Sequence, residues 1–212
     1  MARISIIVPV LNEAAVATRN LARFQSWRAE GHELIVVDGG SGDGTPEAVA
    51  DYADRVMAAT RGRAAQMNVG ADVARGEVLW FVHVDTLPPA DAPRLILEGL
   101  ATSARQWGRF DVRLTGDRPL LRVVAAAMNR RSRWTGIATG DQGLFVRREV
   151  FEAVGGFPPL PLMEDIALSR TLKAHGRPLC LRAPVVVSSR RWERDGVMRT
   201  IALMWRLRLA YF

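Results

Sequence analysis

The 212-residue sequence predicts an α/β fold, with a doubly wound, mostly parallel sheet and a smaller mixed second lobe. Short apolar runs alternate with segments of helical periodicity along the first half of the chain. The runs are apolar at successive positions, as in strands that helices cover on both faces. Polar residues follow the ends of three runs, and the strand ends are where such sheets bind ligands.

Two apolar strands open the predicted sheet. The first is Ile4–Val10, and a helix with apolar residues at helical spacing follows it until Gly31 stops it. The second strand covers residues 34–37 and ends at Asp38. Polar residues thus fall just past each strand end, Asn12 and Glu13 in the first case.

The pattern then repeats. Thr45 is expected to cap a helix with Pro46 at its first position, where the missing N–H costs nothing. A short strand near Val56, a helix up to about residue 74 and a strand at residues 78–82 complete this half.

The alternation weakens in the second half. We expect a helix near residues 94–100, a half-exposed strand around residues 110–114 and a helix at about residues 120–128. The basic residues 130–133 are interpreted as a solvated loop. Residues 1–86 and 87–212 are then two lobes of one domain.

Composition narrows the function classes. The formal charge is +7, and Lys173 is the only lysine among 29 basic residues, so arginine supplies a charge suited to phosphate or an anionic surface. The arginines are scattered and lack aromatic interleaving, which argues against nucleic acid. Cys180 lies between two leucines, which predicts a buried thiol in a reducing compartment, the cytoplasm.

The N-terminus resembles a signal peptide in outline, but Pro9 interrupts the apolar run and Glu13 precedes the apparent cleavage site. No stretch of about 18 consecutive apolar residues predicts a membrane span.

The glycine-rich residues 38–44 lie between a strand and a helix, where backbone amides can hold phosphate or a carboxylate. The pattern D-x-G-x-G-x-G also looks like the cofactor loop of S-adenosylmethionine-dependent methyltransferases. That function expects an acid after the next strand, and residues 58–61 contain none. A dinucleotide fingerprint fails because Thr45 stands in place of the third glycine, and a calcium loop fails because Gly40 and Gly42 occupy ligand positions. A flexible turn is the remaining interpretation.

Four short motifs occur in a characteristic order. They are residues 7–13 (IVPVLNE), Val37-Asp38, residues 82–86 (VHVDT) and Glu164-Asp165. Together they resemble the family 2 glycosyltransferases over nearly the whole chain. The resemblance implies the GT-A fold and inverting transfer of a sugar from a nucleotide diphosphate donor, typically a UDP-sugar, to an acceptor hydroxyl. Residues 62–68, 140–143 and 189–192 further resemble a small bacterial subgroup labelled as arsenosugar-biosynthesis-type glycosyltransferases.

The resemblance implies a divalent metal, Mn²⁺ or Mg²⁺. Asp85 matches the second acid of the family's D-x-D signature, and the first acid is replaced by His83. His83 could contact ribose, bind the metal or simply pack, and a nitrogen ligand would favour Mn²⁺. A structural alternative for Asp85 is a helix cap before Pro88.

The resemblance also implies which residues contact the donor. Asp38 matches the acid that binds the base and Glu13 one that approaches base or ribose, while Gly39 stands where the family usually has a second aspartate. The assigned donor contacts in full are Pro9, Asn12, Glu13, Asp38, Arg63, His83, Arg190, Arg191 and Trp192. The last three resemble a Q-x-x-R-W motif with Ser188 in place of glutamine, which implies diphosphate contact without polymer synthesis.

Glu164 and Asp165 compete for the role of general base. Asp165 shares a helical face with Leu168, Ser169 and Leu172, and Glu164 lies on a different face. Asp165 therefore leads the inward stripe and is the preferred base, and the helix start is expected to keep it ionised.

A C-terminal amphipathic helix is expected to place five apolar residues on one side, Ile201, Met204, Trp205, Leu209 and Phe212. It would pack against the domain or lie on anionic lipid at the inner membrane face. The acceptor is then either a small molecule or lipid-linked.

Overall fold

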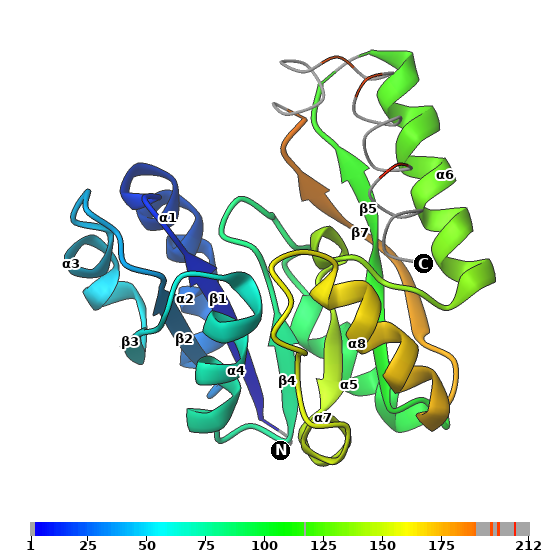
Figure 1. The fold of residues 1–212 in the computed structure, drawn as a ribbon, viewed down its shortest axis with the longest axis horizontal. Coiled ribbons are helices and arrows are strands. Elements are labelled where there is room, and N and C mark those ends of the chain that lie inside the picture. Colours follow the sequence, from blue (N-terminus) through cyan, green and yellow to red (C-terminus); the bar gives the residue numbers. More distant parts are fainter. Residues whose placement is uncertain (1–2, 117, 190–195, 197–198, 200–205, 207–212) are drawn as a thin grey trace.

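The computed structural model describes residues 3–116, 118–189, 196, 199 and 206, and they form one seven-stranded sheet flanked by helices (Figure 1). The strand order is β3-β2-β1-β4-β6-β5-β7. In chain order the strands are β1 (Ile4–Val10), β2 (Glu33–Asp38), β3 (Arg55–Ala58), β4 (Val78–Phe81), β5 (Trp107–Leu114), β6 (Phe145–Arg147) and β7 (Leu179–Val187). β6 pairs antiparallel with β4 and β5, and the other strand pairs are parallel.

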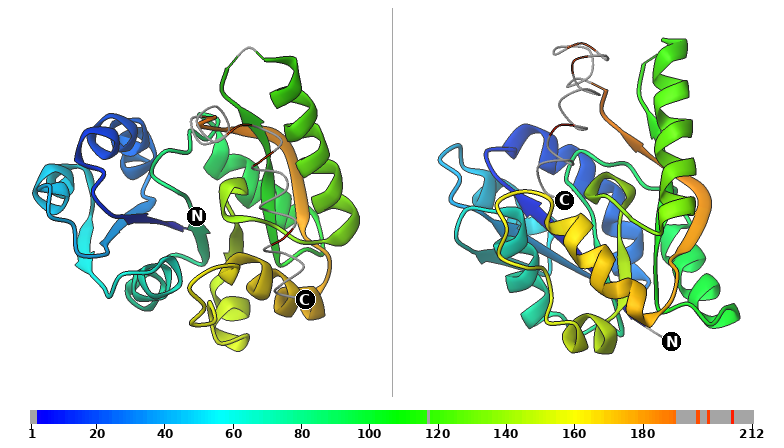
Figure 2. Two further views of the ribbon diagram at one scale, coloured as in Figure 1. Left: turned by 45° about the horizontal axis from the view of Figure 1, so that its top comes forward. Right: turned by 45° about the vertical axis from the view of Figure 1, so that its right-hand side comes forward.

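Helices cover both faces of the sheet (Figure 2). They are α1 (Ala14–Leu21), α2 (Gln25–Ala29), α3 (Thr45–Val49), α4 (Arg63–Val73), α5 (Ala92–Thr102), α6 (Pro119–Thr135), α7 (Arg148–Ala153) and α8 (Glu164–Leu172). Four short 3-10 helices add η1 (Ala22–Phe24), η2 (Ala50–Tyr52), η3 (Gly140–Gln142) and η4 (Lys173–His175). One apolar core contains residues of α1, α2, α5 and α6, and the other contains residues of α4, α7 and α8. The predicted doubly wound sheet is confirmed.

The two cores explain why the central strands lack polar alternation. Ile6 and Val8 of β1 belong to one core and Ile7 to the other, and all three are fully buried. Pro9 pairs with Val37 of β2, whereas the pairing of β1 with β4 has already ended at Ile7. The proline therefore lies where one side of the ladder no longer needs its N–H.

The structure corrects the expected cap of α3. Gly44 is the N-cap residue, with a φ of 78°, and Thr45 is the first helical residue. The Thr45 hydroxyl instead donates to Asp43 and accepts the N–H of Glu13. Its polar group thus joins two loops instead of closing a helix end.

Residues 130–133 are helical, so the predicted loop is wrong. α6 continues to Thr135 and ends at Gly136, which has a left-handed φ of 68°. Two polar side chains of this stretch have partners on β5: Ser132 is buried and accepts a hydrogen bond from Nε of Arg109. Arg133 donates to Asp111 at 2.6 Å. Burial against β5 therefore stabilises a segment that its charge alone suggested was solvated.

Cys180 is only half-buried on β7, so the prediction of a buried thiol is wrong. Within the described ranges, no helix is long and apolar enough to cross a membrane. The predicted C-terminal helix, including Ile201, Met204, Trp205, Leu209 and Phe212, lies outside the described residues.

Candidate functional site

Three parallel strands bring the predicted ligand-binding residues to one edge of the sheet (Figure 1). β1 lies between β2 and β4, so the carboxyl ends of all three meet at that edge. Asp38 ends β2, and Asn12 and Asp85 come shortly after β1 and β4. The predicted convergence of three polar clusters is therefore confirmed at the level of the backbone.

The loop after β1 is hydrogen-bonded to the glycine loop after β2. The N–H of Asn12 donates to the Ser41 hydroxyl at 2.8 Å, and the N–H of Gly42 donates to Oδ1 of Asn12 at 2.9 Å. The N–H of Glu13 donates to the Thr45 hydroxyl at 2.9 Å. Asn12 has a left-handed φ of 54°, a conformation that asparagine tolerates better than most residues. The two loops therefore form one structural unit.

Asp38 organises the glycine loop. Its side chain is buried, and Oδ2 accepts the N–H groups of Gly40 and Ser41, each at 2.9 Å. Oδ1 accepts the Ser41 hydroxyl. The loop is thus an ordered turn instead of the flexible one considered from the sequence. A contact from Asp38 to a nucleotide base stays a prediction. Such a contact would use carboxylate lone pairs of Asp38 that do not accept hydrogen bonds from Gly40 or Ser41.

Gln66 of α4 is a site residue that the sequence reasoning missed. Its amide nitrogen donates to the carbonyl oxygens of Val10 and Val37, both at 2.8 Å, so one side chain joins the ends of β1 and β2. A Cβ atom on Gly39 would lie 3.0 Å from Cδ of Gln66. The buried glutamine therefore fills the space that a residue 39 side chain would need, which explains the glycine there. The sequence signal that could have identified Gln66 is a polar glutamine among the small and apolar residues of the predicted helix.

His83 packs against the turn that contains η3. Its side chain is only 13% exposed, and Nδ1 lies 3.5 Å from Oδ1 of Asp141. A Cβ atom on Gly140 would lie 2.8 Å from Cε1 and Nε2 of the ring, so only glycine permits this approach. Of the roles considered for His83, packing is observed, and contact with ribose or metal stays a prediction. In the sequence, Gly140 and Asp141 stand out only as part of the motif at residues 140–143. They are more than 50 residues from His83, so no local pattern indicates that they contact it.

The two candidate base residues lie at the start of α8, across from the same turn. Oδ2 of Asp165 accepts the N–H of Gly140 at 2.6 Å, and Oδ1 accepts the N–H of Ile166 at 2.7 Å. Leu168, Ser169 and Leu172 are buried, as the helical spacing predicted. Glu164 is also buried, with 4% exposed, so the expectation that only Asp165 faces inward is wrong.

Burial dominates the ionisation of both carboxyl groups. It raises the pKa of Asp165 despite the hydrogen bonds from Gly140 and Ile166, which act in the opposite direction. The helix start was expected to favour the ionised form of Asp165, but desolvation outweighs the groups that favour ionisation and raises the pKa. Burial and the charge of Asp165 raise the pKa of Glu164, and the positive charges of Arg63 and His83 partly oppose that rise.

Arg63 joins this group from another element. It is the first residue of α4, it follows Gly62 with a φ of 140°, and its side chain is exposed. Its charge acts on Glu164, so the structure brings together the beginning of α4, the end of β4 and the beginning of α8. Arg190, Arg191 and Trp192, the remaining predicted donor contacts, lie outside the described residues.

Asp85 lies in a turn that is held at several points. The N–H of Thr86 donates to the carbonyl of His83 at 2.9 Å, and the side-chain amide of Asn20 donates to the carbonyl of Val84 at 2.7 Å. Among the described residues no three His, Cys, Asp or Glu side chains cluster as a metal site. Mg²⁺ commonly takes one or two protein carboxylates and completes its shell with phosphates and water. The residues present therefore fit a cation that shares a diphosphate, and they do not fit an all-protein cage.

The cap alternative for Asp85 is wrong. α5 begins at Ala92, and Asp91 is its N-cap residue. Leu87 and Val186 exchange two backbone hydrogen bonds at 2.8 Å, which tie the same loop to β7. Asp85 is thus a loop residue fixed from two sides, with its side chain half-buried.

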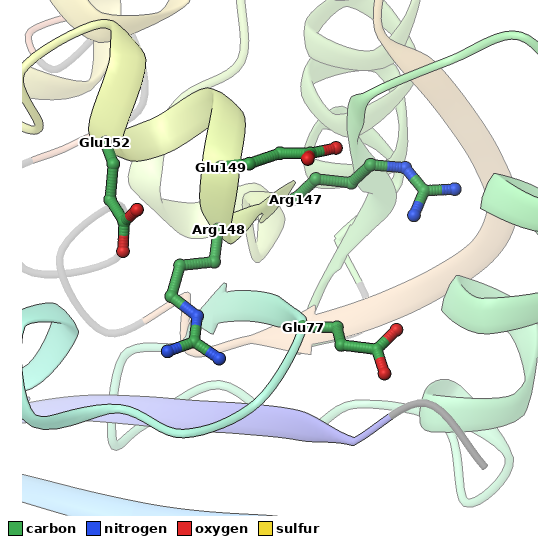
Figure 3. Close-up of a pocket in the computed structure, with 5 residues that line it drawn as sticks. All are labelled: Glu77, Arg147, Arg148, Glu149 and Glu152. Carbon is green, nitrogen blue, oxygen red and sulfur yellow. The ribbon is translucent and has the colours of Figure 1, made fainter.

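A separate pocket of about 340 Å³ lies away from this edge (Figure 3). It is lined by Glu77, Arg147, Arg148, Glu149 and Glu152, and Glu77 directly precedes β4, at the opposite end of that strand. Both terminal nitrogens of Arg148 donate to backbone carbonyls, those of Ala74 and Arg75. None of the predicted site residues lines this pocket.

Comparison with solved structures agrees with this architecture. A mannosyltransferase from Pyrobaculum calidifontis, in complex with GDP-Man and Mn²⁺, has a TM-score of 0.65 at 24% identity, covering 87% of this chain and 56% of that one. S. aureus TarS residues 1–349 have a TM-score of 0.71 at 21% identity, covering 95% and 64%. Glucosyl-3-phosphoglycerate synthase from Mycobacterium tuberculosis, with Mn²⁺, UDP and glucosyl-3-phosphoglycerate, has a TM-score of 0.66 at 20% identity, covering 88% and 71%.

These likenesses show the fold, and the first two relatives are considerably longer than the part that this chain matches. No protein of curated function matches the sequence. The family model described as glycosyl transferase family 2 matches residues 5–155, which includes the strand-end loops and the turn at Gly140. The chain belongs to glycosyl transferase family 2.

Proposed function

We propose that the protein is an inverting glycosyltransferase that moves a sugar from a UDP-sugar to an acceptor hydroxyl and depends on Mn²⁺ or Mg²⁺. The observation that carries this proposal is the placement of Asp165. Its carboxyl group accepts the N–H of Gly140, and Gly140 packs against His83, which follows the end of β4. Solved relatives of the same fold bind UDP-GlcNAc in one case and UDP with Mn²⁺ in another.

Asp165 is the proposed general base. Each of its oxygens accepts one backbone N–H, which leaves further lone pairs for the acceptor hydroxyl. In the transfer, Asp165 takes the hydroxyl proton while the hydroxyl oxygen bonds to the anomeric carbon. The bond from that carbon to the β-phosphate oxygen breaks, and the nucleoside diphosphate leaves with the electron pair. A raised pKa makes the ionised carboxylate a stronger base.

Glu164 is the competing base. It is also buried, and the positive charges of Arg63 and His83 lower its pKa against the effect of burial. We assign it to shaping the charge around Asp165 instead of to proton transfer. Separate substitutions of the two acids test this division, since only the base is expected to control the chemical step.

Asp85 is the proposed ligand of the divalent cation, with His83 as a candidate second ligand. When bound, the cation neutralises charge that develops on the leaving diphosphate. Substituting His83 with alanine is expected to change which metal supports activity, because an imidazole nitrogen suits Mn²⁺ better than Mg²⁺.

The remaining donor contacts follow from the same loops. Asn12, Glu13 and Asp38 would hold the base and ribose, with Pro9 fixing the strand end before them, and Arg63 would approach uracil or diphosphate. Arg190, Arg191 and Trp192 are proposed to contact the diphosphate. Residues 1–86 would thus be the donor half and residues 87–212 the acceptor half. A small-molecule or lipid-linked acceptor, the arsenosugar-type subgroup and a cytoplasmic location are further parts of the proposal.

A screen of nucleotide sugars that measures released nucleotide tests the donor assignment, and mass spectrometry of products formed in cell extract identifies the acceptor. UDP with Mn²⁺ is expected to raise the melting temperature, since a ligand that binds only the folded state stabilises it. Absence of a shift with any nucleoside diphosphate contradicts the proposal. Binding of S-adenosylhomocysteine that persists in EDTA would instead support methyl transfer.

A further inference from the structure

The outer face of α6 carries an exposed apolar stripe. Leu120, Val123 and Trp134 are 44%, 63% and 68% exposed, and they are three of the four large apolar side chains exposed among the described residues. Residues three, four and seven apart share a helical face, so these three form one line together with the exposed Ala127. Such a line exceeds the scattered single apolar residues that a protein surface normally shows.

The opposite face of α6 is committed to the fold. Leu121, Val124 and Ala125 are buried in the core, and α6 packs against β5 at one side of the molecule (Figures 1 and 2). The exposed stripe is therefore not needed to hold the helix in place. Within the part of the chain that the structure describes, the stripe stays exposed to solvent.

Positive charge accompanies the stripe. The 17 residues of α6 include four arginines and no acidic residue. Arg122 and Arg130 are exposed, and the guanidinium carbon of Arg130 lies 4.6 Å from the centre of the Trp134 ring. Arg118, directly before the helix, is also exposed. The face thus presents tryptophan, leucine and valine beside several cationic groups.

The apolar stripe and the arginines beside it together indicate which kind of partner binds this face of α6. A second copy of the chain would place the arginines of one α6 against those of the other, where like charges repel. Nucleic acid would use the arginines and leave the leucine and valine without a partner. A bilayer containing anionic lipid satisfies both sets, because the apolar side chains enter the boundary between headgroups and acyl chains while the arginines meet phosphate.

We propose that the outer face of α6, comprising Leu120, Val123, Ala127 and Trp134 with Arg118, Arg122 and Arg130, docks on an anionic membrane surface. The site differs from the C-terminal segment considered from the sequence. It is also independent of the proposed sugar transfer, since none of its residues belongs to the candidate site.

Co-sedimentation with sucrose-loaded vesicles tests the proposal. The full chain is mixed with phosphatidylcholine vesicles or with vesicles that contain equal parts of phosphatidylcholine and phosphatidylglycerol. Binding to the anionic vesicles is expected, with a decline as salt screens the arginines. Val123→Glu with Trp134→Glu should lower the partition coefficient at least ~10-fold, because two apolar contacts become repulsive charges. Arg122→Gln with Arg130→Gln should lower it by roughly 5-fold for each arginine removed.

Leu162→Glu is the matched control, because Leu162 is 46% exposed but lies outside α6. The partition coefficient of this variant on anionic vesicles should fall by no more than about twofold, because the added negative charge lies outside the proposed membrane-docking face. Far-UV circular dichroism and melting temperature establish that each variant is folded. Equal losses in Leu162→Glu and the α6 variants overturn the proposal, as does equal binding to neutral and anionic vesicles. Loss of binding in Trp205→Glu with full binding in the α6 variants would move the membrane contact to the C-terminal segment and also overturn it.

Discussion

Replacing Asp165 with asparagine removes the proposed base while keeping the size of the side chain. General bases contribute about 10²–10⁴-fold to rate, so kcat should fall by that factor while UDP binding is retained. The binding should persist because the carboxyl group of Asp165 is hydrogen-bonded to the N–H groups of Gly140 and Ile166, and the proposed nucleotide contacts are other residues.

The structure also sets the expected change in stability. Both oxygens of Asp165 accept an N–H, at 2.6 and 2.7 Å, and asparagine offers one oxygen and one NH₂ group. One backbone donor is then left without an acceptor, which costs about 1–3 kcal/mol. Removal of a buried charge opposes this loss, since burial raises the pKa of Asp165. At roughly 2–4 °C for each kcal/mol, the melting temperature should fall by no more than about 12 °C.

Nucleotide release and product formation, measured with a saturating donor, give kcat, and calorimetry gives UDP affinity. Asp72→Asn is the matched control, because Asp72 is exposed near the end of α4 and the substitution is chemically the same. Glu164→Gln should reduce kcat less than Asp165→Asn does. A loss below tenfold in Asp165→Asn, or a larger loss in Glu164→Gln, would refute the assignment of the base.

Three other predictions follow from the same contacts. Gln66→Leu removes the hydrogen bonds to Val10 and Val37 and should lower the free energy of unfolding by about 1–3 kcal/mol, measured by urea denaturation, and weaken UDP binding. An unchanged UDP affinity would show that the loop ends do not depend on Gln66. Gly140→Ala places a Cβ atom 2.8 Å from the His83 ring, so the ring must shift. We expect a lower kcat together with a loss of stability of about 1–3 kcal/mol, whereas unchanged kcat would mean that the ring position is unimportant. Because burial raises the pKa of Asp165, the contribution of this group to the free energy of unfolding is fully present below its unfolded-state pKa and is lost as pH rises through its folded-state pKa. Over the same pH range kcat/KM should rise, because the base becomes ionised. If the free energy of unfolding and kcat/KM rose together with pH, this prediction would be contradicted.

The sheet could be predicted because its signals are local. β1 and β2 are buried on both faces, so their sequences are nearly continuous apolar runs. The polar residues at or just after the end of each run indicate where the strand ends. The order β4-β6-β5-β7 could not be predicted in this way, since β6 has three residues and enters antiparallel between β4 and β5. Its position depends on contacts with strands more than 30 residues away.

The candidate site shows the same division. Asp38, Asp85 and Asp165 could be selected from strand ends, motif order and helical spacing. The roles of Gln66 and Gly140 could not, because each depends on a contact across the fold, with Gly39 in one case and His83 in the other. Burial likewise reversed the expected effect on the pKa of Asp165, since the environment of a carboxyl group is not encoded in the helix start alone.

Calorimetric titration of UDP into the protein with Mn²⁺, compared with the same titration in EDTA and with Asp85→Ala, tests most directly that this sheet edge is a metal-dependent nucleotide-sugar site. We expect binding with Mn²⁺, loss of that binding in EDTA, and loss of binding in Asp85→Ala at an unchanged melting temperature of the free protein. Asp91→Ala, which alters the acid at the start of α5, is the control and should bind as the unaltered chain does. Retained Mn²⁺-dependent binding in Asp85→Ala, or UDP binding that needs no metal, would contradict the account.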